Sequence, residues 1–153
     1  MGMKLIETTI NNSSAWLEHN VLSGGWPEYV EELIRIITSG GDHQKANVVV
    51  KDDRHRYNIT YDDGCVEVIK FFEAPDDAKY AILHWHGFDG VDISANWTNT
   101  SYEETFKEMT AEYTNFVDRF DVPCGKYCNG HAVVIDTGTE WYGWKIVCLE
   151  KGE

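Results

Sequence analysis

The sequence predicts an α+β fold, a single mostly antiparallel sheet of about six strands with two or three helices packed on one face. Between residues 46 and 88, short apolar stretches alternate with polar residues and are separated by turn-forming residues, which is typical of strands. Before and after this region, apolar residues three and four positions apart indicate helices. Because the chain has 153 residues and shows no linker or internal repeat, we expect a single domain over 1–153.

The first forty residues are predicted to form one strand and two helices. Residues 4–10 are rich in Leu, Ile and Thr and favour a strand. Ser13 or Ser14 can cap a short helix that runs through residues 15–21. A second helix is expected from Pro27 to Ile37, because proline suits a first helical turn and the apolar residues of this segment repeat at helical spacing.

The middle of the chain is predicted to be a four-strand antiparallel meander. Its expected strands are residues 46–51, 54–61, 65–72 and 80–88. The sequence Asp62-Asp63-Gly64 is a strong hairpin signal between the second and third of them.

The last third is predicted to hold a loop, a long helix and two strands. Residues 89–100 are expected to be a loop, and Ser101 with Glu104 forms a capping box that begins a helix of roughly 20 residues. An aromatic stripe of this helix should pack on the sheet; it consists of Tyr102, Phe106, Met109, Tyr113, Phe116 and Phe120. Strands are expected at 131–136 and 141–149, with an irregular segment around residues 124–128.

The strong negative charge limits the possible partners. The chain has 26 Asp and Glu against 13 Lys and Arg, a net charge of −13. Such a surface repels nucleic-acid backbones and anionic membranes and attracts basic proteins over long distances. We therefore expect a basic protein partner, a nuclease or another nucleic-acid-binding protein, and neither direct nucleic-acid binding nor membrane association.

The predicted function is that of an acidic inhibitor that docks on this basic partner. If the aromatic stripe of the long helix faces inward, its acidic residues gather on the outer side. In physical type, though not in sequence, such a chain resembles immunity proteins against nuclease toxins and phage proteins that block host defence. We expect Glu103, Glu104, Glu108 and Glu112 to bind the partner, with Trp97 or Trp141 as exposed aromatic anchors. This function requires no cofactor.

The alternative is a zinc-dependent hydrolase built on the sequence His84-Trp85-His86. On a strand, residues two apart point to the same side, so both imidazoles could bind one ion, and zinc would then activate a water molecule. A third ligand would come from elsewhere in the chain, from His131, Asp89 or Asp92. Cys124, Cys128 and His131 form a second small cluster that could join the two histidines in one composite metal site. The alternative without a metal is a pair of histidines on the polar face of a sheet.

The N-terminal residues and the cysteines bear on the cellular location. Residues 1–10 lack the apolar core of a secretion signal, so we expect a cytoplasmic protein. The four cysteines, Cys65, Cys124, Cys128 and Cys148, are then expected to be free thiols. The sequence leaves open whether any of them is bridged and what the oligomeric state is.

Overall fold

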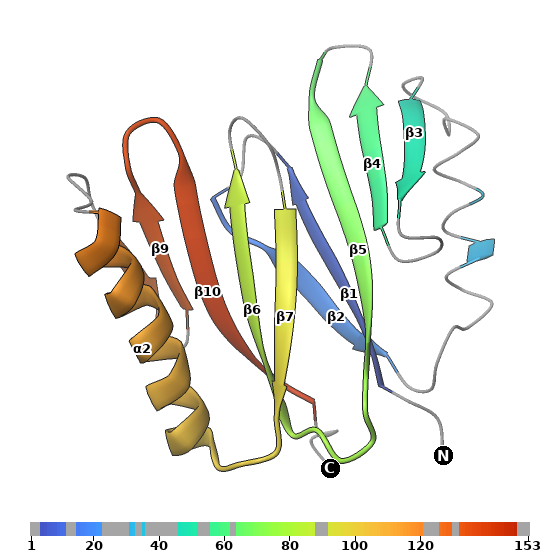
Figure 1. Ribbon diagram of the computed structural model, residues 1–153. Coiled ribbons are helices and arrows are strands. Elements are labelled where there is room, and N and C mark those ends of the chain that lie inside the picture. Colours follow the sequence, from blue (N-terminus) through green and yellow to red (C-terminus); the bar gives the residue numbers. More distant parts are fainter. Residues whose placement is uncertain are drawn as a thin grey trace. The chain divides into compact units, whose positions relative to one another are not determined.

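The protein is described by a computed structural model (Figure 1). The structure describes residues 4–11, 15–22, 31–32, 35, 46–51, 56–61, 64–87, 92–120, 126–129 and 132–149. Within these ranges, only the backbone is described for Lys4, Phe120 and the segments 46–51 and 126–129. The chain divides into two compact units, unit 1 over residues 1–76 and unit 2 over residues 77–153.

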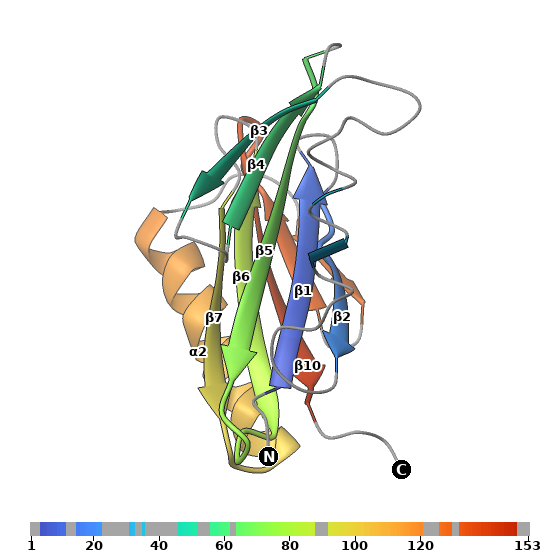
Figure 2. The same ribbon diagram turned by 90° about the vertical axis from the view of Figure 1, so that its right-hand side faces the viewer.

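Unit 1 contains an antiparallel sheet of five strands, four of which have described side chains. Figures 1 and 2 both show β1 and β2 side by side and β4 beside β5. The order across the sheet is β2 (Glu18–Leu22), β1 (Lys4–Asn11), β5 (Val66–Ala74), β4 (Arg56–Tyr61) and β3 (Ala46–Lys51).

Unit 2 contains a second antiparallel sheet of five strands, again four of them with described side chains, and the helix α2 (Tyr102–Phe120). The helix packs against β6 and β10, the central strand of this sheet. The order across this sheet is β7 (Asp92–Thr98), β6 (Tyr80–Gly87), β10 (Trp141–Cys148), β9 (Ala132–Asp136) and β8 (Lys126–Asn129).

The two units repeat one topology. In each, the chain forms two strands, then a helical segment, then three strands, and the second, first, fifth, fourth and third of these strands lie in that order across the sheet. In unit 2 the helical segment is α2. In unit 1, Glu31, Glu32 and Arg35 are helical and lie between β2 and β3, and the remainder of the predicted helix Pro27–Ile37 is outside the described residues.

The prediction of one six-stranded sheet with two or three helices is therefore wrong. The strands up to β5 belong to one sheet and those from β6 onward to another, because β6 pairs with β7 and β10. The helix expected over residues 15–21 is replaced by β2, whose backbone pairs with β1 from Leu22 opposite Leu5 to Glu18 opposite Thr9. A helix this short is marginal alone, so pairing with an adjacent strand overrides its propensity.

Two further segments were predicted as irregular and are strands. The expected loop over 89–100 contains β7, and the expected irregular segment around 124–128 contains most of β8. The strands expected at 46–51, 54–61, 65–72, 80–88, 131–136 and 141–149 are confirmed, with shifted ends. The long helix with its N-terminus at Ser101 is confirmed as well. The prediction of a single domain stays a prediction.

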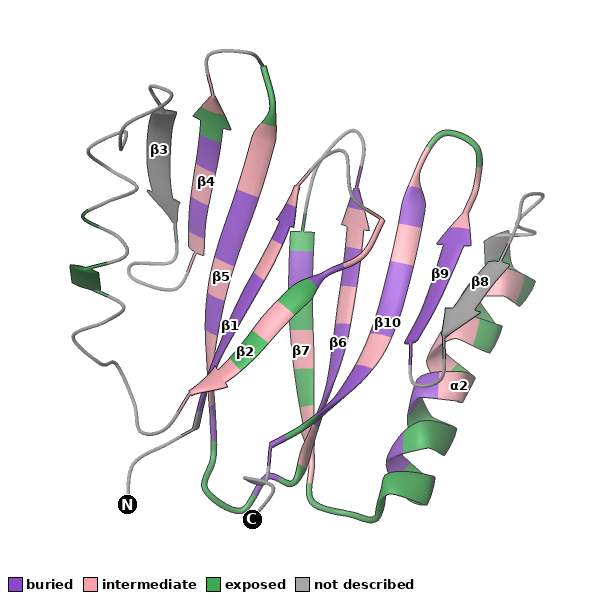
Figure 3. Cartoon of the chain, turned by 180° about the vertical axis from the view of Figure 1, so that it is seen from behind, coloured by how far each residue is buried: buried purple, intermediate pink, exposed green. Residues whose placement is uncertain are grey.

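One apolar cluster of unit 1 lies on one face of its sheet, and Ile6, Ile10 and Val68 are buried on the other face. Tyr57 and Phe71 meet edge to face, with ring centroids 6.1 Å apart and an interplanar angle of 81°. Figure 3 shows buried residues in purple along β1, β4 and β5. The buried members of the cluster are Leu5, Tyr57, Ile59, Ile69 and Phe71.

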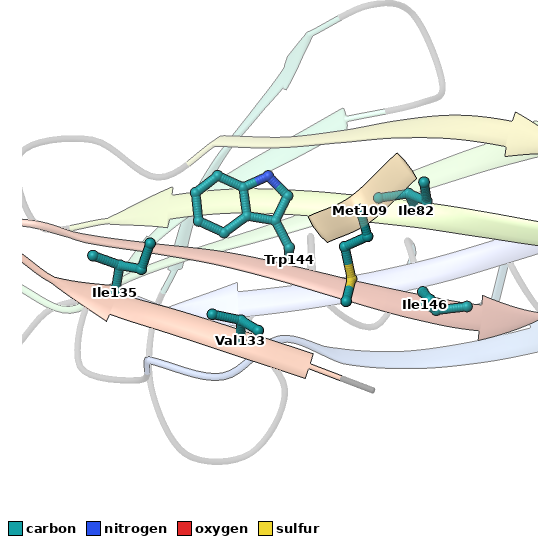
Figure 4. Close-up of a cluster of buried hydrophobic side chains, with 6 residues drawn as sticks. All are labelled: Ile82, Met109, Val133, Ile135, Trp144 and Ile146. Atoms are coloured by element: carbon teal, nitrogen blue, oxygen red, sulfur yellow. The ribbon is translucent and has the colours of Figure 1, made fainter. Parts of the chain in front are cut away.

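One core cluster of unit 2 lies between α2 and its sheet. Met109, which has no exposed surface, projects from the helix onto the sheet (Figure 4). Burial of a side chain of this size contributes about 1.5–3 kcal/mol to docking of the helix. The cluster consists of Ile82, Met109, Val133, Ile135, Trp144 and Ile146, with Tyr113, Phe116 and Tyr142 packed against it.

The opposite face of the unit 2 sheet carries two pairs of tryptophan and glycine. Trp85 lies opposite Gly143, and Trp141 lies opposite Gly87. A Cβ atom built on Gly143 would lie 2.2 Å from the Trp85 ring, and one on Gly87 would lie 2.3 Å from the Trp141 ring. Each glycine therefore leaves the space that the indole across the strand pair occupies.

Candidate functional site

The capping residues of α2 fix the position of its acidic side chains. The backbone N–H of Glu104 donates to Ser101 Oγ at 3.1 Å, and that of Thr105 donates to the Ser101 carbonyl at 3.0 Å. These bonds satisfy N–H groups that a helix start leaves unpaired. The carboxylate of Glu104 lies 3.6 Å from Lys107 Nζ on the next turn.

Three of the four acidic residues predicted to bind the partner are exposed. Glu103, Glu104 and Glu108 are exposed to solvent, as Lys107 is. Figure 3 shows exposed residues in green on the outward side of α2 and buried ones toward the sheet. The first two turns of α2 thus carry three carboxylates and one ammonium, a net charge of −2.

Glu112 differs from the other three because it is only half-exposed and reaches toward the sheet. Burial raises the pKa of its carboxyl group, and the nearby carboxylate of Glu108 raises it further. Hydrogen bonds from the side chains of Asn96 and Trp144 oppose this shift. Glu112 therefore ties α2 to β7 and β10, and its partner-binding role stays a prediction.

The structure does not bring the two predicted tryptophan anchors to the acidic side of α2. Trp97 is half-buried, and strand alternation places it on the face opposite Asn96, away from the helix. Trp141 is 4% exposed, so the prediction that it is an exposed anchor is wrong. Its ring covers Gly87 on the far face of the sheet, and this packing buries it.

Two aromatic residues that were predicted to face inward are exposed instead. Tyr102 is 43% exposed and Phe106 is 37% exposed, whereas Met109 further along the stripe is fully buried. The first turns of α2 thus carry exposed aromatic side chains, the feature that the prediction expected of Trp97 or Trp141. The helical spacing of these residues is visible in the sequence. Spacing alone cannot show which residues of the stripe the sheet covers.

The prediction that His84 and His86 share a face is borne out by the strand alternation of β6. The Nδ1 atom of His84 lies 2.8 Å from the Gly143 carbonyl oxygen, which can only accept, so Nδ1 carries the proton. The His84 ring stacks on Trp144 at 4.4 Å, and the His86 ring stacks on Tyr142 at 5.5 Å.

The electrostatics of His84 favour its neutral form. Burial lowers the pKa of the imidazole, and His86 lowers it further, while the hydrogen bond to Gly143 and the charge of Asp92 oppose these effects. A neutral ring with its proton on Nδ1 carries a lone pair on Nε2, the form in which histidine binds metals or accepts a proton.

Of the other predicted metal ligands, Asp92 lies opposite His86 across the β6 and β7 pair, and Asp89 lies outside the described residues. The cysteine and His131 candidates cannot be placed beside the two histidines. Cys124 and His131 lie outside the described residues, and only the backbone of Cys128 is described, opposite Val133. Over the ranges that the structure covers, no three His, Cys, Asp or Glu side chains are arranged to hold a metal ion. Cys65 and Cys148 are exposed.

The chain matches no protein-family model, no curated protein and no solved structure. In the described part of the chain, no helix has the length and apolar character needed to cross a membrane.

Proposed function

We propose that this is an acidic binding protein that docks on a basic, nucleic-acid-binding protein through the outward side of α2. The observation that supports the proposal best is that the first two turns of α2 carry three exposed carboxylates and, at the edge next to the sheet, two exposed aromatic rings. Interfaces typically use aromatic residues as anchors and charges to select and steer the partner. An inhibitor of the immunity or anti-defence type, acting in the cytoplasm, fits this chemistry.

The charges and the rings have different roles in this proposal. Exposed carboxylates such as Glu103 and Glu108 contribute little to a static contact in water, but they raise the association rate of a cationic partner. Because salt screens exposed charges over about 10 Å at 0.1 M ionic strength, the binding should weaken steeply as salt is added.

The test uses octalysine as a defined cationic probe and measures its dissociation constant by fluorescence anisotropy. The variant Glu104→Lys with Glu108→Lys should weaken binding about tenfold at low salt, because it replaces attraction with repulsion at the proposed face. The matched control is Glu31→Lys with Glu32→Lys, which reverses two exposed acids on the helical segment of unit 1. Both variants change the net charge equally, and each affects one (i, i+3) ion pair, Glu104 with Lys107 or Glu32 with Arg35.

The control separates a defined face from overall charge. The proposal predicts that the unit 1 variant keeps most of the affinity, with less than about a twofold loss. Equal losses in the two variants would mean that only the net charge matters. Binding that does not change between low and physiological salt would also contradict the proposal.

We propose zinc-dependent hydrolysis through His84 and His86 as a second candidate function. The observation that favours it is that the Nδ1 proton of His84 is held by the Gly143 carbonyl, which leaves its Nε2 lone pair on the face it shares with His86. Zinc bound there would supply an activated water molecule. Metal analysis of protein purified without a histidine tag tests this candidate, and less than stoichiometric zinc would exclude it.

A further inference from the structure

Tyr102 and Phe106 form an exposed aromatic surface at the start of α2, and the core does not account for it. They are the two exposed large apolar side chains in the described part of the chain. Their rings stack with centroids 6.2 Å apart and an interplanar angle of 27°. Behind them, Tyr80 of the sheet meets Tyr102 edge to face at 5.8 Å.

This aromatic surface is held firmly before any partner binds. Tyr102 follows the cap residue Ser101, whose hydrogen bonds fix the first turn of the helix. Thr105, on the same turn, is fully buried and its hydroxyl donates to the Ser101 carbonyl at 2.9 Å. Because the backbone that carries the rings is already fixed, little backbone entropy would be lost when a partner contacts them.

The charges around the rings determine which partner fits. Glu103 precedes Phe106 by three residues, so the two side chains are neighbours on the helix surface. Lys107, the one base among residues 102–108, lies 3.6 Å from the Glu104 carboxylate. The rings therefore lie beside a carboxylate in a region of net negative charge, and a cationic group is the complementary occupant.

We propose that the Tyr102 and Phe106 surface, with Glu103 at its edge, binds an arginine side chain from an arginine-rich segment of the partner. This inference rests on the proposed function and names the residue type that the partner presents. A guanidinium group is flat, stacks on aromatic faces and bonds a carboxylate through two N–H groups at once, whereas a lysine ammonium is a compact and strongly hydrated charge. The chain itself places a cation over an aromatic ring at Lys70 and Phe72, where Nζ lies 5.1 Å from the ring centroid.

The test compares octaarginine with octalysine, which carry the same charge, on the full chain. The wild-type protein should bind octaarginine about fivefold more tightly. The variant Tyr102→Ala with Phe106→Ala should bind both peptides with the octalysine affinity. The conservative variant Tyr102→Phe with Phe106→Tyr keeps both rings and should retain the preference.

Three results would overturn the inference in distinguishable ways. If both peptides bind equally and neither affinity changes in the double alanine variant, the arginine surface is refuted while the proposed function stands. If neither peptide binds the wild-type protein, both fail. If light scattering shows a dimer that Tyr102→Ala with Phe106→Ala converts to a monomer, the surface joins two copies of this chain instead. Circular dichroism checks that α2 remains helical in each variant.

Discussion

Units 1 and 2 share a strand order but differ in what their side chains do. The described cluster of unit 1 is made of aliphatic residues with Tyr57 and Phe71. Unit 2 adds tryptophans that lie over glycines, a stack of His84 on Trp144, and a helix with exposed acids and aromatic rings. The comparison teaches that one topology can serve as a simple scaffold in one unit and carry the candidate functional chemistry in the other.

The corresponding hairpins show how the same topology is specified twice. The turn between β4 and β5 contains Gly64 with φ +91°, and the turn between β9 and β10 contains Gly138 with φ +92°. Gly64 donates its N–H to the Tyr61 carbonyl at 2.9 Å, whereas Gly138 donates to Asp136 Oδ1 at 2.8 Å. A left-handed glycine is thus common to both units, although its hydrogen-bond partners differ.

The largest loss of stability should come from adding a methyl group to a glycine that packs under a tryptophan in unit 2. Gly143→Ala places a Cβ atom 2.2 Å from the ring of Trp85, which is fully buried and cannot move aside. We expect a loss of about 3 kcal/mol in the free energy of unfolding, measured by urea denaturation. A loss below about 1 kcal/mol would show that the Trp85 ring does not pack tightly on Gly143.

Replacing the turn glycines by alanine should reduce stability by a smaller amount, and by the same amount in the two units. Gly64→Ala creates no steric contact, so its cost comes only from the positive φ angle and should be about 1 kcal/mol. Gly138→Ala is its counterpart in unit 2 and should cost the same. Urea denaturation of both variants measures this, and costs that differ by more than about 1 kcal/mol would break the correspondence between the hairpins.

The pH dependence of stability should involve His84 of unit 2. Because its pKa is lowered in the folded protein, the unfolded chain takes up the proton first as the pH falls. The stability present above the ordinary histidine pKa of about 6.5 is therefore lost as the pH falls through the folded value. His84→Phe, which keeps a stacking ring, should reduce the difference in unfolding free energy between pH 7 and pH 5. An unchanged difference would show that other groups cause it.

The smallest effect is expected from Glu112, where unit 2 holds a half-buried carboxylate. Its raised pKa means that ionisation costs folding free energy, and this cost appears as the pH rises through the folded value. Glu112→Gln should therefore stabilise the protein at pH 7 by about 0.5 kcal/mol, after allowance for solvent screening, and by less at pH 4. A destabilising effect at both pH values would show that the hydrogen bonds from Asn96 and Trp144 require a charged acceptor.

Local patterns predicted most strands and the long helix, but not how the strands divide into sheets. Alternation in residues 66–74 and 80–87 identifies two strands without saying whether they pair, and here β6 pairs with β7 and with the distant β10 instead. The repeat of topology is not visible in the sequence because strand order depends on pairing between distant residues, which different side chains can satisfy. The β7 strand was detectable, since Ile93, Ala95 and Trp97 alternate with polar residues.

The candidate binding face was predicted in part. Helical spacing correctly placed Glu103, Glu104 and Glu108 on the outside of α2. It could not distinguish exposed from buried tryptophans, because the burial of Trp141 depends on Gly87 across the strand pair. Likewise, Tyr102 and Phe106 belong to the apolar stripe by spacing, and only the position of the helix on the sheet exposes them.

The most direct test of the binding face is an NMR titration of the isotope-labelled full chain with octaarginine. We predict that the largest chemical-shift changes fall on the backbone amides of residues 102–108, with little change in β1, β4 and β5 of unit 1. Changes centred on unit 1, or spread evenly over acidic residues of both units, would contradict the assignment of binding to α2.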